Sequence, residues 1–265
     1  MTISGNLRKM AVELGDPVAY QLNLGESQLD MNSVIGKPIS LRFTGDIHCK
    51  ICGAKTKKSF GQGFCYKHFV SAPENSECII RPELCRGHLG EGRDPEWELA
   101  HHVQPHVVYL AVASGLKVGV TRDTQVPTRW IDQGAWKAIK LCETENRYQA
   151  GQVEVALKEH ISDKTHWQKM LKNVLAEDID LEMEKSRMEE LLPRDMQDWI
   201  SDDDDITEIS YPVLAFPTKV KSLNLDKVPE VSGTLAGIKG QYWIFDDGRV
   251  LNIRKHTGYF VEIDA

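Results

Sequence analysis

The stretch VVYLAVASGLKVGVTRD, residues 107–123, is typical of two short strands joined by a tight turn. Residues 107–112 form an apolar run of strand length, and residues 116–121 form a second one. Between the two runs, Ser114 and Gly115 are residue types that favour turns. The sequence therefore predicts a β-hairpin.

A short helix and a third strand are expected after the hairpin. The segment TQVPTRWIDQGA offers Thr124 as a capping residue and Pro127 in a first helical turn, and it places Arg129 on the helix. Residues 138–143 are strand-like. The expected order is therefore β-β-α-β.

The next segment, NRYQAGQVEVALKEHI, predicts a longer helix. Val153, Leu157 and Ile161 fall on one apolar stripe at helical spacing. Glu154 lies beside that stripe, which would put its carboxylate at the edge of a cleft. A simpler role for Glu154 is an i,i+4 ion pair with Lys158.

Composition divides the rest of the chain into segments around this β-β-α-β-α domain, and the fold class expected is α+β. The predicted segments are a β-rich part at 1–45, a Cys-rich zinc-binding part at 46–100, the β-β-α-β-α domain at 101–175, an acidic helical connector at 176–205 and a β-rich part at 206–265. The connector is interrupted at Pro193 and ends in four aspartates that we interpret as a solvated linker. Asp247 and Gly248 predict a hairpin turn near the C-terminal end. The two β-rich parts are expected to pack together into one sheet or barrel.

The charge is unevenly distributed along the chain. Taken over the whole chain, the net charge of −7 argues against a nucleic-acid partner, because contacts to phosphate need Lys and Arg. However, residues 173–209 alone carry 14 acidic and 3 basic residues, whereas residues 49–70 carry five lysines and no acid. The acidity is therefore local, and a modestly basic face is expected elsewhere.

No targeting or membrane segment is expected. The N-terminus has no charged region followed by an apolar one, and no apolar run approaches the roughly 20 residues needed to cross a bilayer. A cytoplasmic location without a membrane partner follows as the expectation.

Four metal-ligating residues have the spacing of a zinc site. Cys49 and Cys52 form a C-x2-C pair, and Cys65 and His68 form a C-x2-H pair twelve residues later. Two close pairs separated by such a loop are the usual arrangement for tetrahedral Zn²⁺. Because four good ligands leave no position for water, we interpret this zinc as structural.

A second set is less regular. Cys78, Cys85, His88 and His102 could form a second zinc site, or the thiols could be a buried set without metal. Cys142 stands alone on a strand-like piece and is interpreted as a small buried apolar residue.

The order of the hairpin motifs resembles the GIY-YIG nuclease family. In the hairpin, VVY ends in Tyr109 and KVG keeps Gly119, with Lys117 where that family has a second tyrosine. Arg129 matches the family's helix arginine and Glu154 its metal-binding glutamate. The resemblance covers roughly residues 107–161.

This resemblance implies a metal-dependent endonuclease that binds DNA or RNA. It assigns Tyr109 as general base or proton relay, Arg129 as phosphate clamp and Glu154 as the ligand of Mg²⁺ or Mn²⁺. Lys117 would touch phosphate or lower the pKa of a neighbouring acid. The alternatives are an inactive GIY-YIG-like binding module and a zinc-stabilised protein-interaction scaffold.

The whole chain also resembles a bacterial family known only as a domain of unknown function. The shared features are the Cys-rich segment and the motifs SGLKVGVTR, PTRWIDQGA and SDKTHW. This resemblance implies functional surfaces at the last two motifs. It also implies a further cysteine at the position where this chain has Gly92.

Overall fold

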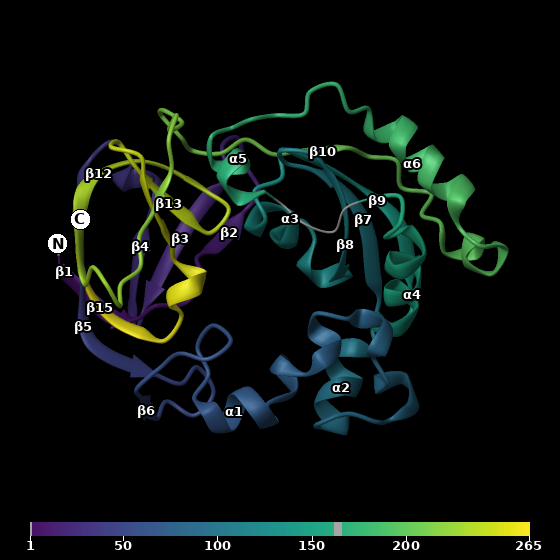
Figure 1. The fold of residues 1–265 in the computed structure, drawn as a ribbon, viewed down its shortest axis with the longest axis horizontal. Coiled ribbons are helices and arrows are strands. Elements are labelled where there is room, and N and C mark those ends of the chain that lie inside the picture. Colours follow the sequence, from purple (N-terminus) through teal and green to yellow (C-terminus); the bar gives the residue numbers. More distant parts are fainter. Residues whose placement is uncertain (1, 162–165) are drawn as a thin grey trace. The chain divides into compact units, whose positions relative to one another are not determined.

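The computed structural model describes residues 2–161 and 166–265. The chain forms two compact units (Figure 1). The first unit comprises Met1–Phe69, Leu171–Asn173 and Ile209–Ala265, and the second comprises Val70–Met170 and Val174–Glu208. Residues 162–165, the start of the SDKTHW motif, lie outside the described ranges.

The first unit is built on strands from both ends of the chain. The main sheet has the order β1-β15-β5-β12-β13-β14-β11, with β6 paired to β5, and a separate sheet has the order β2-β3-β4. The strands are β1 (Thr2–Asn6), β2 (Ala11–Glu13), β3 (Ala19–Leu24), β4 (Ser27–Asp30), β5 (Pro38–His48), β6 (Lys55–Thr56), β11 (Lys221–Ser222), β12 (Glu230–Lys239), β13 (Tyr242–Phe245), β14 (Arg249–Asn252) and β15 (Tyr259–Asp264). The expectation that the two β-rich parts share a sheet is confirmed.

Strands from the two ends of the chain pair with each other and contribute side chains to the core of this unit. Ile3 of β1 pairs with Ile263 of β15, and both side chains are buried. The hairpin of β13 and β14 turns where the sequence predicts, with Gly248 at a φ of +80° that a glycine adopts without strain. A Cβ atom at Gly248 would also lie 2.5 Å from the Lys219 carbonyl oxygen.

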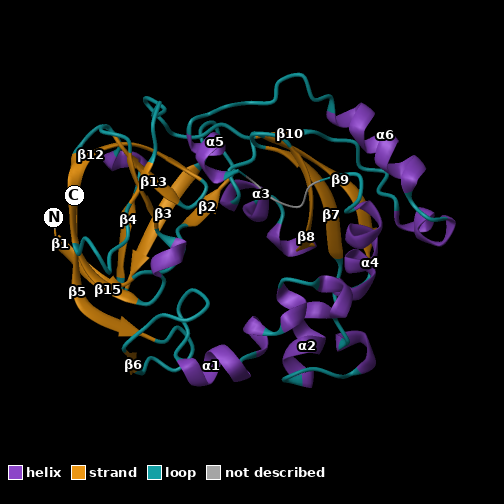
Figure 2. Cartoon of the chain, viewed as in Figure 1, coloured by secondary structure: helices purple, strands orange, loops and turns teal. Residues whose placement is uncertain are grey.

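The second unit contains the predicted hairpin within a four-stranded antiparallel sheet of order β10-β9-β7-β8. Its strands are β7 (His106–Val112), β8 (Leu116–Arg122), β9 (Lys137–Thr144) and β10 (Thr207–Glu208), and its helices include α2 (Pro95–His102), α3 (Thr128–Asp132), α4 (Arg147–Leu157) and α6 (Leu181–Leu191). Two further helices, α1 (Tyr66–Ser71) and α5 (Trp167–Leu171), span the unit boundaries. The order β7-β8-α3-β9-α4 agrees with the β-β-α-β-α order expected (Figure 2).

Helices α4 and α6 bury one face of this sheet. Helix α4 ends at Leu157, so Ile161, which the sequence placed on the same helix, lies beyond its end. Val153, Leu157 and Ile161 are nevertheless all buried in one core with strand residues such as Val108. Cys142 lies in the same core with no exposed surface, and burial raises its pKa to about 12. Its interpretation as a small apolar residue is confirmed.

The start of the short helix differs from the prediction. Thr124 lies in a separate 3-10 turn, Asp123–Gln125, and does not cap α3. The N-cap position is taken by Pro127, whose side chain offers no hydrogen bond. The helix α3 is instead fixed by its buried residues Trp130 and Ile131. Packing therefore replaces the capping that the sequence suggested.

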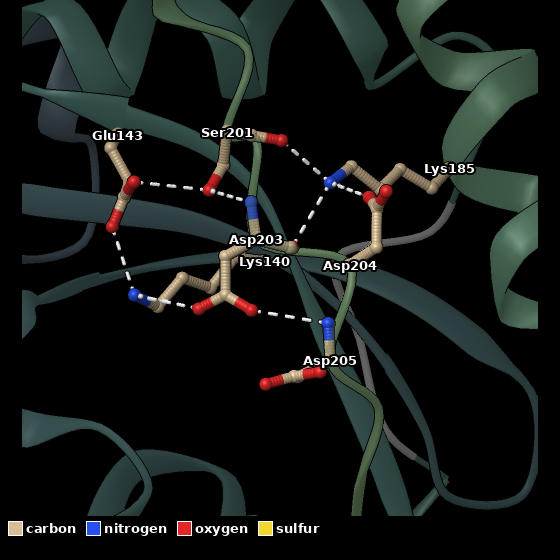
Figure 3. Close-up of polar contacts among 7 residues, drawn as sticks. All are labelled: Lys140, Glu143, Lys185, Ser201, Asp203, Asp204 and Asp205. Atoms are coloured by element: carbon tan, nitrogen blue, oxygen red, sulfur yellow. Dashed lines mark hydrogen bonds and ion pairs between the residues drawn. The ribbon is translucent and has the colours of Figure 1, made fainter.

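The acidic run after α6 is anchored, so its interpretation as a solvated linker is wrong in part. Lys185 of α6 is buried, and its Nζ donates to the carbonyl oxygens of Ser201 (2.7 Å) and Asp203 (3.1 Å) and to Oδ1 of Asp204 (2.6 Å) (Figure 3). Asp203 also pairs with Lys140 of β9 at 3.2 Å. The carboxylates reach solvent, but the backbone is held by a buried ammonium that lies far away in the sequence.

Within the described residues, no helix combines the length and the apolar character needed to cross a membrane.

Candidate functional site

The first Cys/His group comes together in the first unit as the spacing predicts. Cys49, Cys52, Cys65 and His68 offer ligand atoms that all lie within 4.8 Å of one another. Nδ1 of His68 lies 3.5 Å from Sγ of Cys49 and 3.4 Å from Sγ of Cys65. Cys49 follows β5 in a turn closed by the Gly53 N–H, and His68 lies on α1.

The chemistry of this group suits a structural metal. Burial works against the Cys49 thiolate, but backbone N–H groups of Cys52, Cys65 and Ile51 outweigh it and lower the pKa of Cys49 to about 6. A thiolate that is favoured near neutral pH is the form that binds Zn²⁺. Three sulfurs and one imidazole also satisfy tetrahedral coordination. The residues present therefore fit a zinc ion.

A second group forms in the second unit. It consists of Cys78, Cys85, Glu98 and His102, whose ligand atoms also lie within 4.8 Å of one another. Nδ1 of His102 lies 3.8 Å from Sγ of Cys78 and 3.6 Å from Sγ of Cys85, and it contacts the Glu98 carboxylate. All four side chains are shielded from solvent, Cys78 the least at 8% exposure.

Burying several potential anions together is costly unless a cation neutralises them. A hydrogen bond from Cys85 is the main cause that lowers the pKa of Cys78 to about 4, followed, after the opposing effect of burial, by His102 and Ser76. Burial raises the pKa of Glu98. A divalent ion would neutralise the negative charge of the buried thiolates and carboxylate. The donor set of two sulfurs, one imidazole and one carboxylate therefore fits Zn²⁺.

The structure places Glu98, rather than His88, in the second group. The His88 ring stacks on Tyr148 with 4.7 Å between centroids. Glu98 and His102 are four residues apart on α2, so both side chains reach the same side of the helix. That i,i+4 spacing is the signal in the sequence that could have identified Glu98.

The absence of a side chain at Gly92 leaves room for Glu98 in the second group. A Cβ atom at Gly92 would lie 2.4 Å from Cγ and 2.8 Å from Oε1 of Glu98. Glu98 therefore fills the space in which a cysteine side chain at position 92 would lie.

The second group is tied to helix α4. Arg147 at the start of α4 donates from Nε to the Cys78 carbonyl oxygen and from Nη2 to that of Ile79, each at 2.9 Å. A Cβ atom at Gly151 would lie 2.2 Å from the Glu83 backbone nitrogen, so α4 lies directly against the Cys-rich backbone. The second Cys/His group thus helps to position the helix that carries Glu154.

The hairpin arranges its motif residues around a buried tyrosine. Tyr109 of β7 pairs with Gly119 of β8 and has no exposed surface. A Cβ atom at Gly119 would lie 2.6 Å from the Tyr109 hydroxyl oxygen, so the ring can lie over β8 only because residue 119 is a glycine. The Trp130 ring of α3 packs edge-on against Tyr109 at 5.9 Å.

The charges of Arg129 and Glu154 have opposite effects on the pKa of Tyr109. Burial is the main reason that the pKa of Tyr109 is raised; the charge of Arg129 and the side chain of Gln133 lower it, and the charge of Glu154 raises it. Glu154 is 8% exposed, and its Oε2 lies 3.8 Å from Nζ of Lys158. The structure therefore brings side chains of β7, α3 and α4 into one electrostatic cluster.

Lys117 lies on β8 opposite Ala111, two residues before Gly119, so it shares a sheet face with Tyr109. Its side chain is only 4% exposed. Lys117, which takes the place of a tyrosine in the resemblance, is thus buried in the second unit.

The comparison with family models matches residues 36–261 to a family described as a protein of unknown function, DUF2797. The chain belongs to the DUF2797 family. No curated protein and no solved structure matches this DUF2797 chain. The two Cys/His-rich groups and the cluster at Tyr109 all fall inside the matched range.

Proposed function

We propose that this DUF2797 protein binds zinc and nucleic acid and hydrolyses phosphodiester bonds at the cluster formed by Tyr109, Arg129 and Glu154. The observation that carries the proposal is the complete burial of Tyr109 against α3, the helix that carries Arg129. Glu154 of α4 is also buried, and the charges of Arg129 and Glu154 both contribute to the shifted pKa of Tyr109. These three side chains come from separate elements in the order that the GIY-YIG resemblance implies. The cytoplasmic location expected from the sequence is part of this proposal.

Each side chain has a defined task in such a reaction. The planar guanidinium of Arg129 can hold two oxygens of a phosphate. A tyrosine hydroxyl is protonated near neutral pH, and burial, which raises the pKa of Tyr109, disfavours its ionised form further. Tyr109 would therefore act as a proton donor or relay rather than as a base. Glu154 would hold Mg²⁺ or Mn²⁺, and a bound divalent ion would stabilise the charge that develops on the phosphoryl oxygens.

The test is cleavage of labelled single-stranded and duplex DNA and RNA by the zinc-loaded protein in Mg²⁺ or Mn²⁺. We expect cleavage that Glu154→Gln abolishes. Glu159→Gln is the matched control, because Glu159 is exposed just beyond α4. No cleavage by the wild type, or equal cleavage by both variants, would reject the enzyme.

The second candidate is a binding module without catalysis. The observation that favours it is the complete burial of Tyr109 together with the burial of Lys117. It predicts salt-sensitive nucleic-acid binding that survives both Tyr109→Phe and Glu154→Gln, with no cleavage. A stable protein partner in a pull-down, with no nucleic-acid binding at low salt, would instead favour the scaffold.

A further inference from the structure

The loop between the two ligand pairs of the first Cys/His group, together with α1, carries exposed cations and aromatic rings. We call this surface the basic-aromatic face and define it as Lys57, Lys58, Phe60, Tyr66 and Lys67. The three lysines are exposed, and Tyr66 is 65% exposed. Apolar side chains that gather on one exposed surface with polar residues around them often mark interaction sites.

The rings are in mutual contact. Phe60 meets Tyr66 edge-on at 5.5 Å between centroids, and it lies 5.8 Å from Phe69. The Nζ of Lys58 lies 5.4 Å from the Phe60 centroid. The contacts place a positive charge and an accessible ring next to each other on one small surface.

The loop is ordered by hydrogen bonds within it and by its packing against Thr257. The backbones of Phe60 and Phe64 pair through hydrogen bonds of 3.0 and 2.9 Å. The Ser59 hydroxyl accepts from the Gly63 N–H at 2.8 Å, and a Cβ atom at Gly63 would lie 2.7 Å from Cγ2 of Thr257. A surface that is ordered before binding loses less entropy when a ligand arrives.

The face is positive although the whole chain is acidic. Residues 49–70 contain five lysines and no acid. Lys55 is compensated by Asp46, whose carboxylate lies 2.6 Å from the lysine Nζ. Lys57 and Lys58 are exposed beside it and extend the positive charge toward the Phe60 ring.

We propose that the basic-aromatic face binds single-stranded nucleic acid, with a base stacked on Tyr66 and the backbone phosphates near Lys57 and Lys58. Stacking on an aromatic ring requires a base whose face is free, which a single strand offers and a paired duplex does not. The lysines supply the sequence-independent attraction to phosphate. This inference rests on the proposed function for the class of partner, and it requires no catalysis by Tyr109, Arg129 or Glu154.

The experiment is fluorescence anisotropy with the full zinc-loaded chain, Mg²⁺ withheld, and a labelled 20-mer of thymidine, a 20-mer of uridine or a 20-base-pair duplex. We expect both single strands to bind more tightly than the duplex. Tyr66→Ala is expected to weaken single-strand binding roughly 5- to 150-fold, since stacking contributes about 1–3 kcal/mol per base. Tyr66→Phe keeps the ring and should retain affinity.

Charge variants separate this surface from general attraction. The double variant Lys57→Glu and Lys58→Glu should weaken binding and reduce its salt dependence. The control is Lys37→Glu with Lys219→Glu, the same charge change at exposed lysines elsewhere in the first unit. Zinc content and circular dichroism of each variant establish that it has folded.

Each outcome of these experiments either supports or overturns the inference. Equal weakening by the control, equal affinity for the duplex, insensitivity to Tyr66→Ala in a folded variant, or no binding at low salt would each overturn the inference. Binding that depends on Tyr66 without any cleavage supports it while the enzyme proposal fails. Cleavage with binding that ignores Tyr66 and Lys57 does the reverse.

Discussion

The side chain of Glu98 lies where a side chain at position 92 would have to be, since a Cβ atom at Gly92 would approach Cγ of Glu98 to 2.4 Å. The Glu98 side chain, as it lies in the structure, therefore leaves no room for a side chain at position 92. With a glycine at 92, the carboxylate of Glu98 reaches the sulfurs of Cys78 and Cys85 and the imidazole of His102.

Glu98→Ala should cost the protein its second zinc ion, leaving about one ion per chain by elemental analysis, because three donors bind more weakly than four. Adding Gly92→Cys to Glu98→Ala should restore only part of the zinc binding, because residue 92 has a φ of +157°, which a cysteine adopts with strain. Cobalt substitution provides an independent readout, because a third thiolate strengthens the sulfur-to-cobalt absorption. Glu96→Ala, at an exposed position on the same helix, should change nothing. Full zinc occupancy in Glu98→Ala would contradict this ligand assignment.

Gly119→Ala should destabilise the second unit by about 1–3 kcal/mol, because the new methyl group would overlap the Tyr109 hydroxyl, and overpacking in an interior has this typical cost. Urea unfolding followed by circular dichroism measures the change. Gly115→Ala, in the turn of the same hairpin, meets no atom within 4 Å and is expected to be close to neutral. Equal effects of the two substitutions would show that the close approach of Tyr109 is not the cause.

Lys185→Met should destabilise the protein by about 1–3 kcal/mol, since it leaves the carbonyl oxygens of Ser201 and Asp203 without their buried donor. Asp204→Asn should cost much less, because that side chain is 76% exposed and water replaces the partner. Lys169→Met, at an exposed site in the second unit, is the matched control. The midpoints of urea unfolding compare the three variants, and a loss no larger in Lys185→Met than in the control would refute the anchor.

Lowering the pH should reduce the stability of the first unit, because the buried His256 ring resists protonation. Its Nδ1 lies 2.8 Å from the Asn252 carbonyl oxygen, and its Nε2 accepts from the Leu225 N–H at 3.2 Å, so the buried ring is neutral. Burial is the main cause of its lowered pKa. Because the folded state binds the proton less readily than the unfolded chain does, stability is fully present above about pH 6.5 and falls as the pH drops below that value.

The measurement is the free energy of unfolding in urea between pH 7.5 and 5.5 with zinc in excess. His256→Gln is expected to be less stable at pH 7.5 but to lose less stability on acidification than the wild type. His160→Gln, at an exposed position, should retain the wild-type slope. Equal slopes for all three proteins would exclude His256 as the titrating group.

Features that depend on neighbouring residues were predictable. The hairpin of β7 and β8 follows from two apolar runs around Ser114 and Gly115, and α4 follows from a stripe at helical spacing. The first Cys/His group was also predictable, because each ligand pair lies within a single turn of backbone and only one loop has to close.

Features that depend on distant residues were not. Nothing near the aspartate run indicates that Lys185 holds it. Glu98 joins its group because Gly92 leaves room, which becomes visible only when α2 is packed against that backbone. The fourth ligand was therefore assigned to His88, whose ring in fact stacks on Tyr148.

The sequence by itself determined the α+β character, the hairpin with its following helices, and the Cys49, Cys52, Cys65 and His68 ligand set, because local spacing governs each of them. Only the tertiary structure decided that β1 pairs with β15, that Glu98 joins the second group, and that Tyr109 is buried against Gly119 and Trp130. These relationships arise from burial and close packing between segments that are separated in the chain. Local sequence patterns do not indicate which of these side chains will pack together.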